Sequence, residues 1–292
     1  MIIVKIHGGL GNQLFQYATG RALSYSLHLP LKLDISFFMN SHNRKFLLRN
    51  YNISPQYATP EEIRKVKMRD YPFPIQKLIS IFRKMKSENT LYIKEGSRSL
   101  DVDQLGGYHQ IYLKGYWQSE KYFRDIEPVI RSEFILTSKP DSINQQYLVG
   151  ILSSNSVSIH IRRGDYISDL RVNKKFVVCS LDYYQKAIDV ISEKVTNPQF
   201  YIFSDDPEWV SKNFHIQHPT ILISHNTNQE HEDLRLMSSC KHHIIANSSF
   251  SWWGAWLGTN IDKVTIAPYK WLNNPSKDMR DLIPDRWIRI NE

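Results

Sequence analysis

The chain has 292 residues, of which 41% are hydrophobic and 23% are charged, and this composition excludes a disordered chain and a protein built of membrane-spanning segments. Its 37 lysines and arginines outnumber its 29 aspartates and glutamates, and the net charge of +8 favours anionic partners such as nucleotide sugars, nucleic acid or an anionic membrane surface. The length allows one large or two ordinary domains.

Two cysteines, Cys179 and Cys240, are too few for a disulfide scaffold, so we expect buried thiols in a reducing compartment. The first residues enter a strand directly and lack the pattern of a signal peptide. No apolar run approaches the roughly 20 residues that cross a bilayer. The sequence therefore predicts a cytoplasmic protein.

A glycine-rich loop follows the first predicted strand, Ile2–Ile6, and leads into a predicted helix over residues 12–27. Glycines at such a junction allow close approach of a ligand. The next predicted strand ends in Asp34. This order permits one interpretation as a dinucleotide-binding oxidoreductase, in which Gly9, Gly11 and Asp34 would hold the cofactor.

The same loop also permits a second interpretation, which we favour. Leu14 stands where the dinucleotide fingerprint requires its third small residue. Asn12 and Gln13 place two neutral amides in the loop, and amides both donate and accept hydrogen bonds, as sugar hydroxyls do. We therefore expect Gly9, Gly11, Asn12 and Gln13 to form a substrate-contacting loop.

Prolines divide residues 36–110 into short pieces, one of which is a predicted basic amphipathic helix over Ile75–Lys86. Such a helix can lie on an anionic membrane, although packing on its own domain is the more common role. A peripheral position at the inner membrane face therefore stays open as an alternative.

Aromatic and amide residues then occur together in the segment Tyr112–Trp117, a predicted strand, and in a predicted helix that runs from Gln118 to near Pro128. These aromatic rings either stack on sugar faces or belong to an ordinary core.

The chain turns polar around Pro140–Gly150, where we place a boundary between a domain of residues 1–148 and one of residues 149–292. Beyond it, predicted strands (157–161, 199–203, 220–223, 243–246 and 263–267) alternate with predicted helices (181–194, 207–214, 230–239 and 250–257). This rhythm predicts a parallel sheet with helices on both faces.

Two adjacent arginines, Arg162 and Arg163, follow the strand Val157–Ile161, and Gly164 and Asp165 come next. Ligands of open α/β sheets bind outside the carboxyl ends of strands. A guanidinium there can grip a phosphate through two hydrogen bonds. We interpret this strand end as the binding site of a diphosphate leaving group. A surface ion pair is the alternative interpretation.

Two later strand ends carry further candidates. Asp205 can accept hydrogen bonds from a guanine edge or a ribose, whereas Asp206 is expected to cap a helix that starts at Pro207. Ser248 and Ser249 open a later helix, and their hydroxyls with the first backbone N–H groups predict an anion cradle.

Metal binding is not expected. The histidines are scattered, and His242 and His243 are adjacent, so they point to opposite sides of a strand. No HxxxH pattern occurs.

Several stretches together, in this order along the chain, resemble the bacterial α-1,2-fucosyltransferases of glycosyltransferase family 11. The stretches are His7–Ala18, Gly115–Phe123, His160–Tyr166, Phe203–Trp209 and Asn247–Leu257. The central HxRRxD pattern is shared more widely, with α-1,6- and protein O-fucosyltransferases.

The resemblance implies a GT-B-like fold of two Rossmann-like α/β domains facing a cleft. It implies GDP-fucose as donor, no metal or other cofactor, and inversion to an α-1,2 linkage on a galactosyl glycan, either free or lipid-linked as in O-antigen synthesis. By motif position, Arg162 corresponds to the arginine that holds the β-phosphate of GDP, and His160, Arg163 and Asp165 would support it. The donor-binding segment comprises Asn247, Ser248, Ser249 and Phe250. Asn12 would face the fucose and the acceptor.

Alternatives remain at this stage. A fucosyltransferase of another linkage would share Arg162 and the serines and differ in its acceptor loops. A non-catalytic RNA- or glycan-binding protein fits the net charge, yet no basic and aromatic nucleic-acid motif occurs, so we expect no nucleic-acid partner. No general base is identified, although Asp165 is a candidate.

Overall fold

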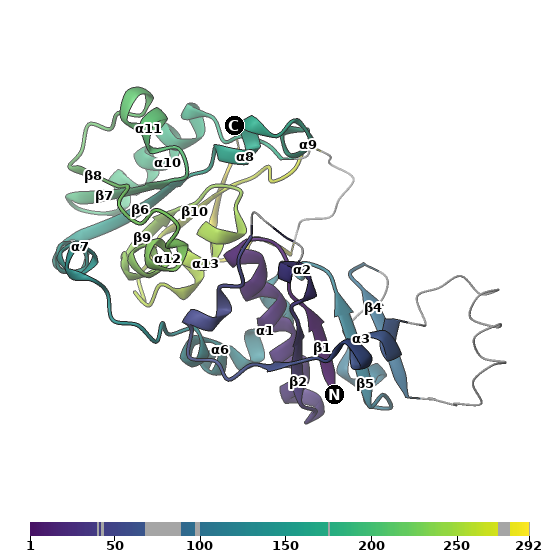
Figure 1. Cartoon of the computed structure of the whole chain (residues 1–292). Helices are drawn as coiled ribbons and strands as arrows, with labels where there is room; N and C mark the ends of the chain where they lie inside the picture. Colours follow the sequence, from purple (N-terminus) through teal and green to yellow (C-terminus); the bar gives the residue numbers. More distant parts are fainter. Residues whose placement is uncertain are drawn as a thin grey trace. The chain divides into compact units, whose positions relative to one another are not determined.

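The computed structural model describes residues 1–39, 41, 44–67, 89–96, 100–174, 176–273 and 281–291. The chain forms two compact units, Met1–Ile135 and Leu136–Glu292, each with its own parallel sheet (Figure 1). The predicted helix over Ile75–Lys86 lies outside the described residues. No helix within the described ranges combines the length and the apolar character needed to span a bilayer.

The division between the units falls earlier than the boundary predicted at residues 148 and 149. That boundary would cut helix α7 (Ser142–Ser153). This helix contacts strand β6 (Asn155–Ile161) and helix α12 (Glu230–Ser239), so its packing assigns it to the second unit.

The sheet of the first unit has the strand order β3-β2-β1-β5-β4, and all its described pairings are parallel. Its strands are β1 (Ile2–Lys5), β2 (Leu31–Asp34), β3 (Gln56–Tyr57), β4 (Thr90–Lys94) and β5 (Gln110–Lys114). Its helices are α1 (Leu10–Leu27), α2 (Ser36–Met39), α3 (Pro60–Lys67), α5 (Val102–Leu105) and α6 (Glu127–Glu133), with 3-10 turns η1 (Leu48–Asn50), η3 (Glu120–Tyr122) and η4 (Arg124–Ile126).

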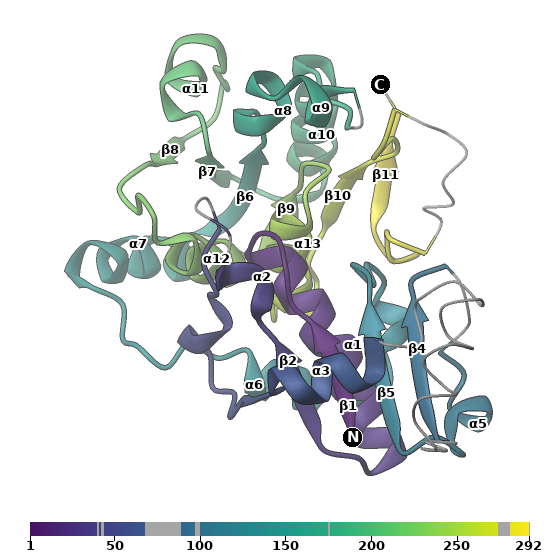
Figure 2. The same ribbon diagram turned by 45° about the vertical axis from the view of Figure 1, so that its right-hand side comes forward.

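Helices cover both faces of this sheet (Figure 2). Ile3 of β1 packs with Val66 of α3. Its neighbour Val4 faces Gly20 of α1, where an added Cβ would lie 3.1 Å from the Val4 Cβ. Because successive side chains of a strand point to opposite faces, α1 and α3 lie on opposite sides of β1.

The predicted helix from Gln118 to near Pro128 is wrong. Two 3-10 turns, η3 and η4, occupy most of this stretch, and α6 begins only at Glu127. Phe123, between the two turns, has φ −143° and ψ 3°, which no α-helix accommodates, and Ser119 caps η3 by accepting from the backbone N–H of Lys121.

The sheet of the second unit has the order β8-β7-β6-β9-β10-β11, with all described pairings parallel. Its remaining strands are β7 (Pro198–Ser204), β8 (Thr220–Ile223), β9 (His242–Ile244), β10 (Thr265–Pro268) and β11 (Ile288–Ile290). Its remaining helices are α8 (Gly164–Ser168), α9 (Leu170–Asn173), α10 (Leu181–Lys194), α11 (Pro207–Asn213) and α13 (Ser249–Leu257). Numbered within the unit, this order is 3-2-1-4-5-6, that of the dinucleotide-binding folds.

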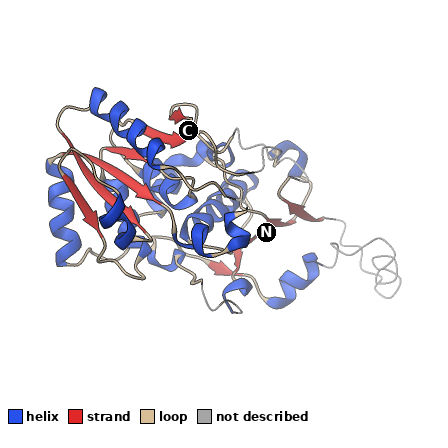
Figure 3. Cartoon of the chain, turned by 90° about the horizontal axis from the view of Figure 1, so that it is seen from above, coloured by secondary structure: helices blue, strands red, loops and turns tan. Residues whose placement is uncertain are grey.

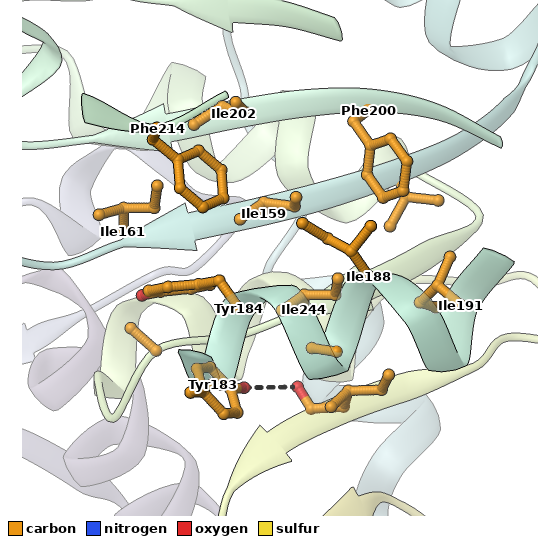
Figure 4. Packing of buried hydrophobic residues seen from close by; sticks show 14 of the residues in the cluster. Ile159, Ile161, Tyr183, Tyr184, Ile188, Ile191, Phe200, Ile202, Phe214 and Ile244 are labelled. Atoms are coloured by element: carbon orange, nitrogen blue, oxygen red, sulfur yellow. Dashed lines mark hydrogen bonds between the residues drawn. The ribbon is translucent and has the colours of Figure 1, made fainter. Parts of the chain in front are cut away.

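Two apolar clusters sandwich this sheet, and the strands lie between helices when seen from above (Figure 3). Phe200 and Ile202 of β7 join the cluster that contains Ile188 of α10 (Figure 4), whereas the intervening Tyr201 joins the cluster that contains Leu236 of α12. The predicted parallel sheet with helices on both faces is therefore confirmed.

The tryptophan side chains of α13 pack in the interior of the second unit. Trp252, Trp253 and Trp256 are all fully buried. Cys179 and Cys240 are buried free thiols, as predicted.

Candidate active site

The carboxyl ends of β6 and β9 meet at the point where the strand order of the second unit reverses. This is where ligands bind in open α/β sheets. The His160 ring lies 5.5 Å from the Phe250 ring, centroid to centroid. The Tyr166 hydroxyl donates to the backbone carbonyl of Asn247 at 2.9 Å. The two strand ends predicted to bind the donor are thus brought together.

Arg162 is held by Asp205, and strand register explains the pairing. β6 and β7 run side by side with Ile161 opposite Ser204, so the next residue of each strand comes opposite the other. The Arg162 Nη1 lies 2.7 Å from the Asp205 Oδ2, and both side chains stay partly exposed at 22% and 25%. The Asp205 Oδ1 accepts from the backbone N–H of Arg163 at 2.8 Å. Asp205, predicted to meet guanine or ribose, is here engaged in orienting the arginine segment.

Gly164 makes this arrangement possible. A Cβ at this position would lie 2.3 Å from the Asp205 Oδ2, far inside van der Waals contact. Only a residue without a side chain lets the carboxylate reach both Arg162 and the Arg163 backbone.

Arg163 has a different set of partners. Its Nε lies 3.3 Å from the Asp206 Oδ2, and its guanidinium carbon lies 3.6 Å from the centroid of the Trp209 ring. Asp206 also caps α11 by accepting from the backbone N–H of Trp209 at 3.2 Å, which confirms its predicted role. Arg163 is therefore anchored on α11.

His160 is buried and neutral beside the arginines. Burial, and then the charge of Arg162, lower the pKa of His160 to about 3. Its carbonyl oxygen accepts from the Tyr184 hydroxyl at 2.9 Å. Its Nδ1 has no hydrogen-bond partner among the described residues. A buried ring nitrogen without a partner is costly unless a ligand supplies one.

Asn247 and Ser248 shape the loop between β9 and α13. The Asn247 amide nitrogen donates to the carbonyl oxygens of Val177 at 2.6 Å and of Trp271 at 3.0 Å. The Ser248 hydroxyl accepts from the backbone N–H of Phe250 at 3.3 Å and caps α13. Ser249 is partly exposed in the first turn of the same helix. Asn247 thus ties the loop to its surroundings.

The remaining predicted residues lie in the first unit, between β1 and α1. Gln13 is fully buried, and its amide nitrogen donates to the carbonyl oxygens of Gly8 at 3.0 Å and Lys45 at 2.8 Å. Asn12 is partly exposed, and its Oδ1 accepts from the Gln118 Nε2 at 2.7 Å. Gln13 is therefore committed to holding the loop, whereas Asn12 stands at its surface.

The glycines of this loop differ in role. Gly8 has φ +82°, a left-handed conformation that favours glycine. Gly9 is the N-cap residue of α1, and Gly11 is buried in its first turn.

Asp34 does not fit the dinucleotide interpretation. It is fully buried, its Oδ2 accepts from the Tyr112 hydroxyl at 2.5 Å, and its Oδ1 accepts from the backbone N–H of Ser36 at 3.0 Å. A carboxylate engaged in this way does not reach a ribose.

An acidic group that the sequence analysis did not single out lies in the first turn of α12. Burial raises the pKa of Asp233 to about 6, and its Oδ1 accepts from the Asn226 amide at 2.9 Å. Asn226 and Asn144 exchange amide hydrogen bonds of 2.9 and 3.0 Å. The run of acids from Glu230 was the signal that could have drawn attention to it.

Two further predictions concern the Asp165 side chain and metal binding. Asp165 lies in α8, and its side chain is outside the described part of the structure. In the part of the chain that the structure describes, no group of three or more His, Cys, Asp or Glu side chains gathers as a metal site.

Comparison with known proteins places this geometry in context. The family model described as glycosyl transferase family 11 matches residues 1–291. An α-1,2-colitosyltransferase of Escherichia coli is 35% identical over 100% of this chain and 99% of its own length. The O-antigen biosynthesis glycosyltransferase WbnK of Escherichia coli is 34% identical over 98% of this chain and 99% of its own length.

Solved structures of similar fold include NodZ α-1,6-fucosyltransferase co-crystallized with GDP, with a TM-score of 0.51 and 12% identity over 87% of this chain and 90% of that one. A FUT1 variant of Arabidopsis thaliana in complex with GDP has a TM-score of 0.55 and 10% identity over 97% of this chain and 74% of that one. These likenesses confirm the predicted GT-B-like α/β fold class.

Proposed function

The chain belongs to glycosyltransferase family 11, and from this membership we propose that it transfers L-fucose from GDP-β-L-fucose to the 2-hydroxyl of a terminal β-galactosyl glycan. The transfer inverts the donor linkage and forms an α-1,2 bond. The acceptor is an oligosaccharide or a lipid-linked glycan of the O-antigen type, and the reaction takes place in the cytoplasm.

One observation carries this proposal: Arg162 stands partly exposed at the switch point, fixed by Asp205 and next to a neutral His160. A fixed guanidinium suits a diphosphate that gains charge as it leaves, because its hydrogen bonds are already oriented before the reaction. NodZ and the FUT1 variant, which share this fold, were crystallized with GDP, and this supports a donor that carries a nucleoside diphosphate.

In the proposed transfer, one bond forms and one bond breaks at the anomeric carbon. The acceptor oxygen forms a bond to the anomeric carbon from the face opposite GDP, the bond from that carbon to the β-phosphate oxygen breaks, and its electron pair leaves with GDP. The hydroxyl proton goes to a base or to the departing phosphate. Asp165 stays the candidate base, and Arg162 stabilises the charge on GDP.

We assign the other predicted residues supporting roles. Asp205 and Gly164 position Arg162, and Arg163 anchors the same turn on α11. Asn247 and Ser248 position the start of α13, where Ser249 and Phe250 contact the donor. In the first unit, Gly9, Gly11 and Gln13 shape the loop that presents Asn12 to the sugars.

A second donor deserves the same test. The 35% identity with an α-1,2-colitosyltransferase favours a colitosyl donor as the alternative to fucose. Both donors require the same leaving-group stabilisation and differ in the sugar.

The deciding experiment measures GDP release by the purified protein in the presence of EDTA, with GDP-fucose or a colitosyl donor and a panel of β-galactosides. We expect release that depends on the acceptor, and NMR of the product then reads the linkage and its anomeric configuration. If neither donor binds or turns over with any acceptor, the donor assignment fails. Loss of turnover with EDTA that added metal restores would contradict a metal-independent mechanism.

A further inference from the structure

We infer that the carboxyl edge of the first unit's sheet, where β1 and β5 end, binds the acceptor sugar through Tyr116, Asn12 and Gln118. We call these three residues the acceptor platform. The ligand would be a neutral pyranoside that lays its apolar C–H face on the Tyr116 ring and directs its hydroxyls to the two amides. This inference rests on the proposed function, and it adds the residues that would recognise the acceptor.

Strand register brings the platform together. β1 and β5 are neighbours with Val4 opposite Leu113, so His7 and Tyr116 follow at matching positions beyond the strand ends. Their ring centroids lie 4.9 Å apart at an interplanar angle of 34°. Two residues beyond Tyr116 in the same loop, the Gln118 Nε2 donates to the Asn12 Oδ1 at 2.7 Å, which joins the loop after β5 to the first turn of α1.

The loop that carries Tyr116 is held in an unusual conformation. The Glu95 carboxylate accepts from the backbone N–H groups of Tyr116 at 2.8 Å and Trp117 at 2.7 Å. Trp117 is almost fully buried, yet it has φ +56°, a left-handed conformation that is unfavourable for a non-glycine residue. Strain of this kind is retained where the surrounding structure enforces it, and it clusters at ligand sites.

Tyr116 remains partly in contact with solvent although its backbone N–H is held by Glu95. Tyr116 as a whole residue is 38% exposed, whereas Trp117 beside it is 1% exposed. Tyr116 is therefore the residue of this clamped pair that reaches the surface. The negative face of an aromatic ring attracts the C–H groups of a pyranose, and the amides of Asn12 and Gln118 match its hydroxyls.

His7, under the Tyr116 ring, is held neutral. The Gln16 Oε1 accepts from the His7 backbone N–H at 2.9 Å, and this bond orients the amide so that its Nε2 faces the His7 Nδ1 at 3.0 Å. Burial, together with the charges of Lys5 and Lys114, lowers the pKa of His7. The aromatic pair therefore offers a neutral surface, which suits a glycan better than a second diphosphate.

The test compares Tyr116→Ala with the control Tyr25→Ala in the purified full chain. Tyr25 belongs to the same unit and is 52% exposed, but it lies in the last turn of α1, away from the platform. With GDP-fucose and a β-galactoside, we expect Tyr116→Ala to raise the acceptor KM about tenfold, the size expected when an aromatic contact is removed, and to leave the donor KM unchanged. Gln118→Ala is expected to raise the acceptor KM severalfold, and Tyr25→Ala to change neither constant.

Two further variants keep the result interpretable. Tyr116→Phe retains the ring and is expected to keep the acceptor KM within about threefold of wild type, since stacking depends on the aromatic face. If Tyr116→Ala does not fold, Tyr116→Leu replaces it, because leucine fills space without offering an aromatic face.

The possible outcomes separate the inference from the proposed function. If the wild type turns over and Tyr116→Ala or Tyr116→Leu retains the wild-type acceptor KM, the platform is refuted and the proposed function stands. An equal rise in donor and acceptor KM would also overturn it, because the substitution would then disturb the protein generally and not the acceptor site alone. If the wild type neither binds nor uses any GDP-sugar, the proposed function has failed first.

Discussion

The carboxyl edges of the two sheets carry different chemistry on the same architecture. In the second unit, neighbouring strands β6 and β7 end in two arginines that face two aspartates. In the first unit, neighbouring strands β1 and β5 are followed by segments that carry aromatic rings and amides. Parallel register produces both arrangements, because residues that follow matched strand ends come side by side.

The difference teaches how a transfer reaction can be divided between two similar frameworks. A leaving diphosphate needs fixed positive charge, and a neutral acceptor needs hydrogen-bonding groups and an apolar face. We therefore expect substitutions at the charged edge to act on turnover, and substitutions at the neutral edge to act on acceptor affinity.

Arg162→Ala should have the largest effect. It removes the guanidinium proposed to stabilise GDP, and we expect kcat to fall about a thousandfold, the order seen when one key electrostatic contact to a transition state is lost. Steady-state GDP release measures it. The matched control is Arg171→Ala, whose side chain is 92% exposed and paired with Asp169. Near-normal turnover of Arg162→Ala would show that Arg162 does not stabilise the departing GDP. The proposed difference between the two sheet edges would then fail.

Gly164→Ala should come next. The added Cβ would lie 2.3 Å from the Asp205 Oδ2, so either the carboxylate or the α8 turn must move, and Arg162 moves with it. A displacement of about 1 Å in a reacting group costs on the order of a hundredfold in rate, and we expect a loss of that size in kcat. Gly107→Ala is the control, because an added Cβ there meets nothing within 4 Å. If Gly164→Ala retains wild-type kcat, the Asp205 clamp does not set the position of Arg162.

Much of the fold could be predicted from the sequence, because parallel strands buried on both faces give apolar runs and the helices between them have polar faces. β11 escaped prediction, since three residues, Ile288–Ile290, carry no periodicity that separates them from a loop. The helix expected after Gln118 failed because Phe123 interrupts it, and local propensity does not reveal such a break.

The sequence motifs indicated which residue types follow these strands and not how their side chains pair. Arg162 and Asp206 have the positions that the motifs indicated, yet the partnership of Arg162 with Asp205 depends on which strands are neighbours. Gln13 was expected to contact a ligand because amides suit sugars, and Asn247 because of its motif position, but the amide nitrogens of both donate to backbone carbonyls. The sequence pattern shows which polar groups are present. Only the packing of the folded chain shows which of them already make hydrogen bonds within the protein.

The smallest effect that we predict is on stability, and measuring it tests whether the His160 ring beside the arginines is neutral. The pKa of His160 is about 3 in the folded protein against an ordinary value of 6.5, so between these pH values the unfolded chain binds a proton that the folded chain does not. The stability contributed by neutral His160 is therefore fully present above pH 6.5 and is lost as the pH falls. From pH 7 to pH 5 we expect the wild type to lose about 2 kcal/mol of unfolding free energy more than His160→Asn, at 1.36 kcal/mol for each pH unit below 6.5. Urea unfolding of both proteins at the two pH values measures the difference.

Asp233 has a raised pKa, so its contribution to stability changes with pH in the opposite direction. Because Asp233 is present in both proteins, its contribution cancels when the two losses are compared. Equal losses in the two proteins would mean that His160 takes up its proton in the folded state, and the positive charge at this edge would then exceed that of the arginines.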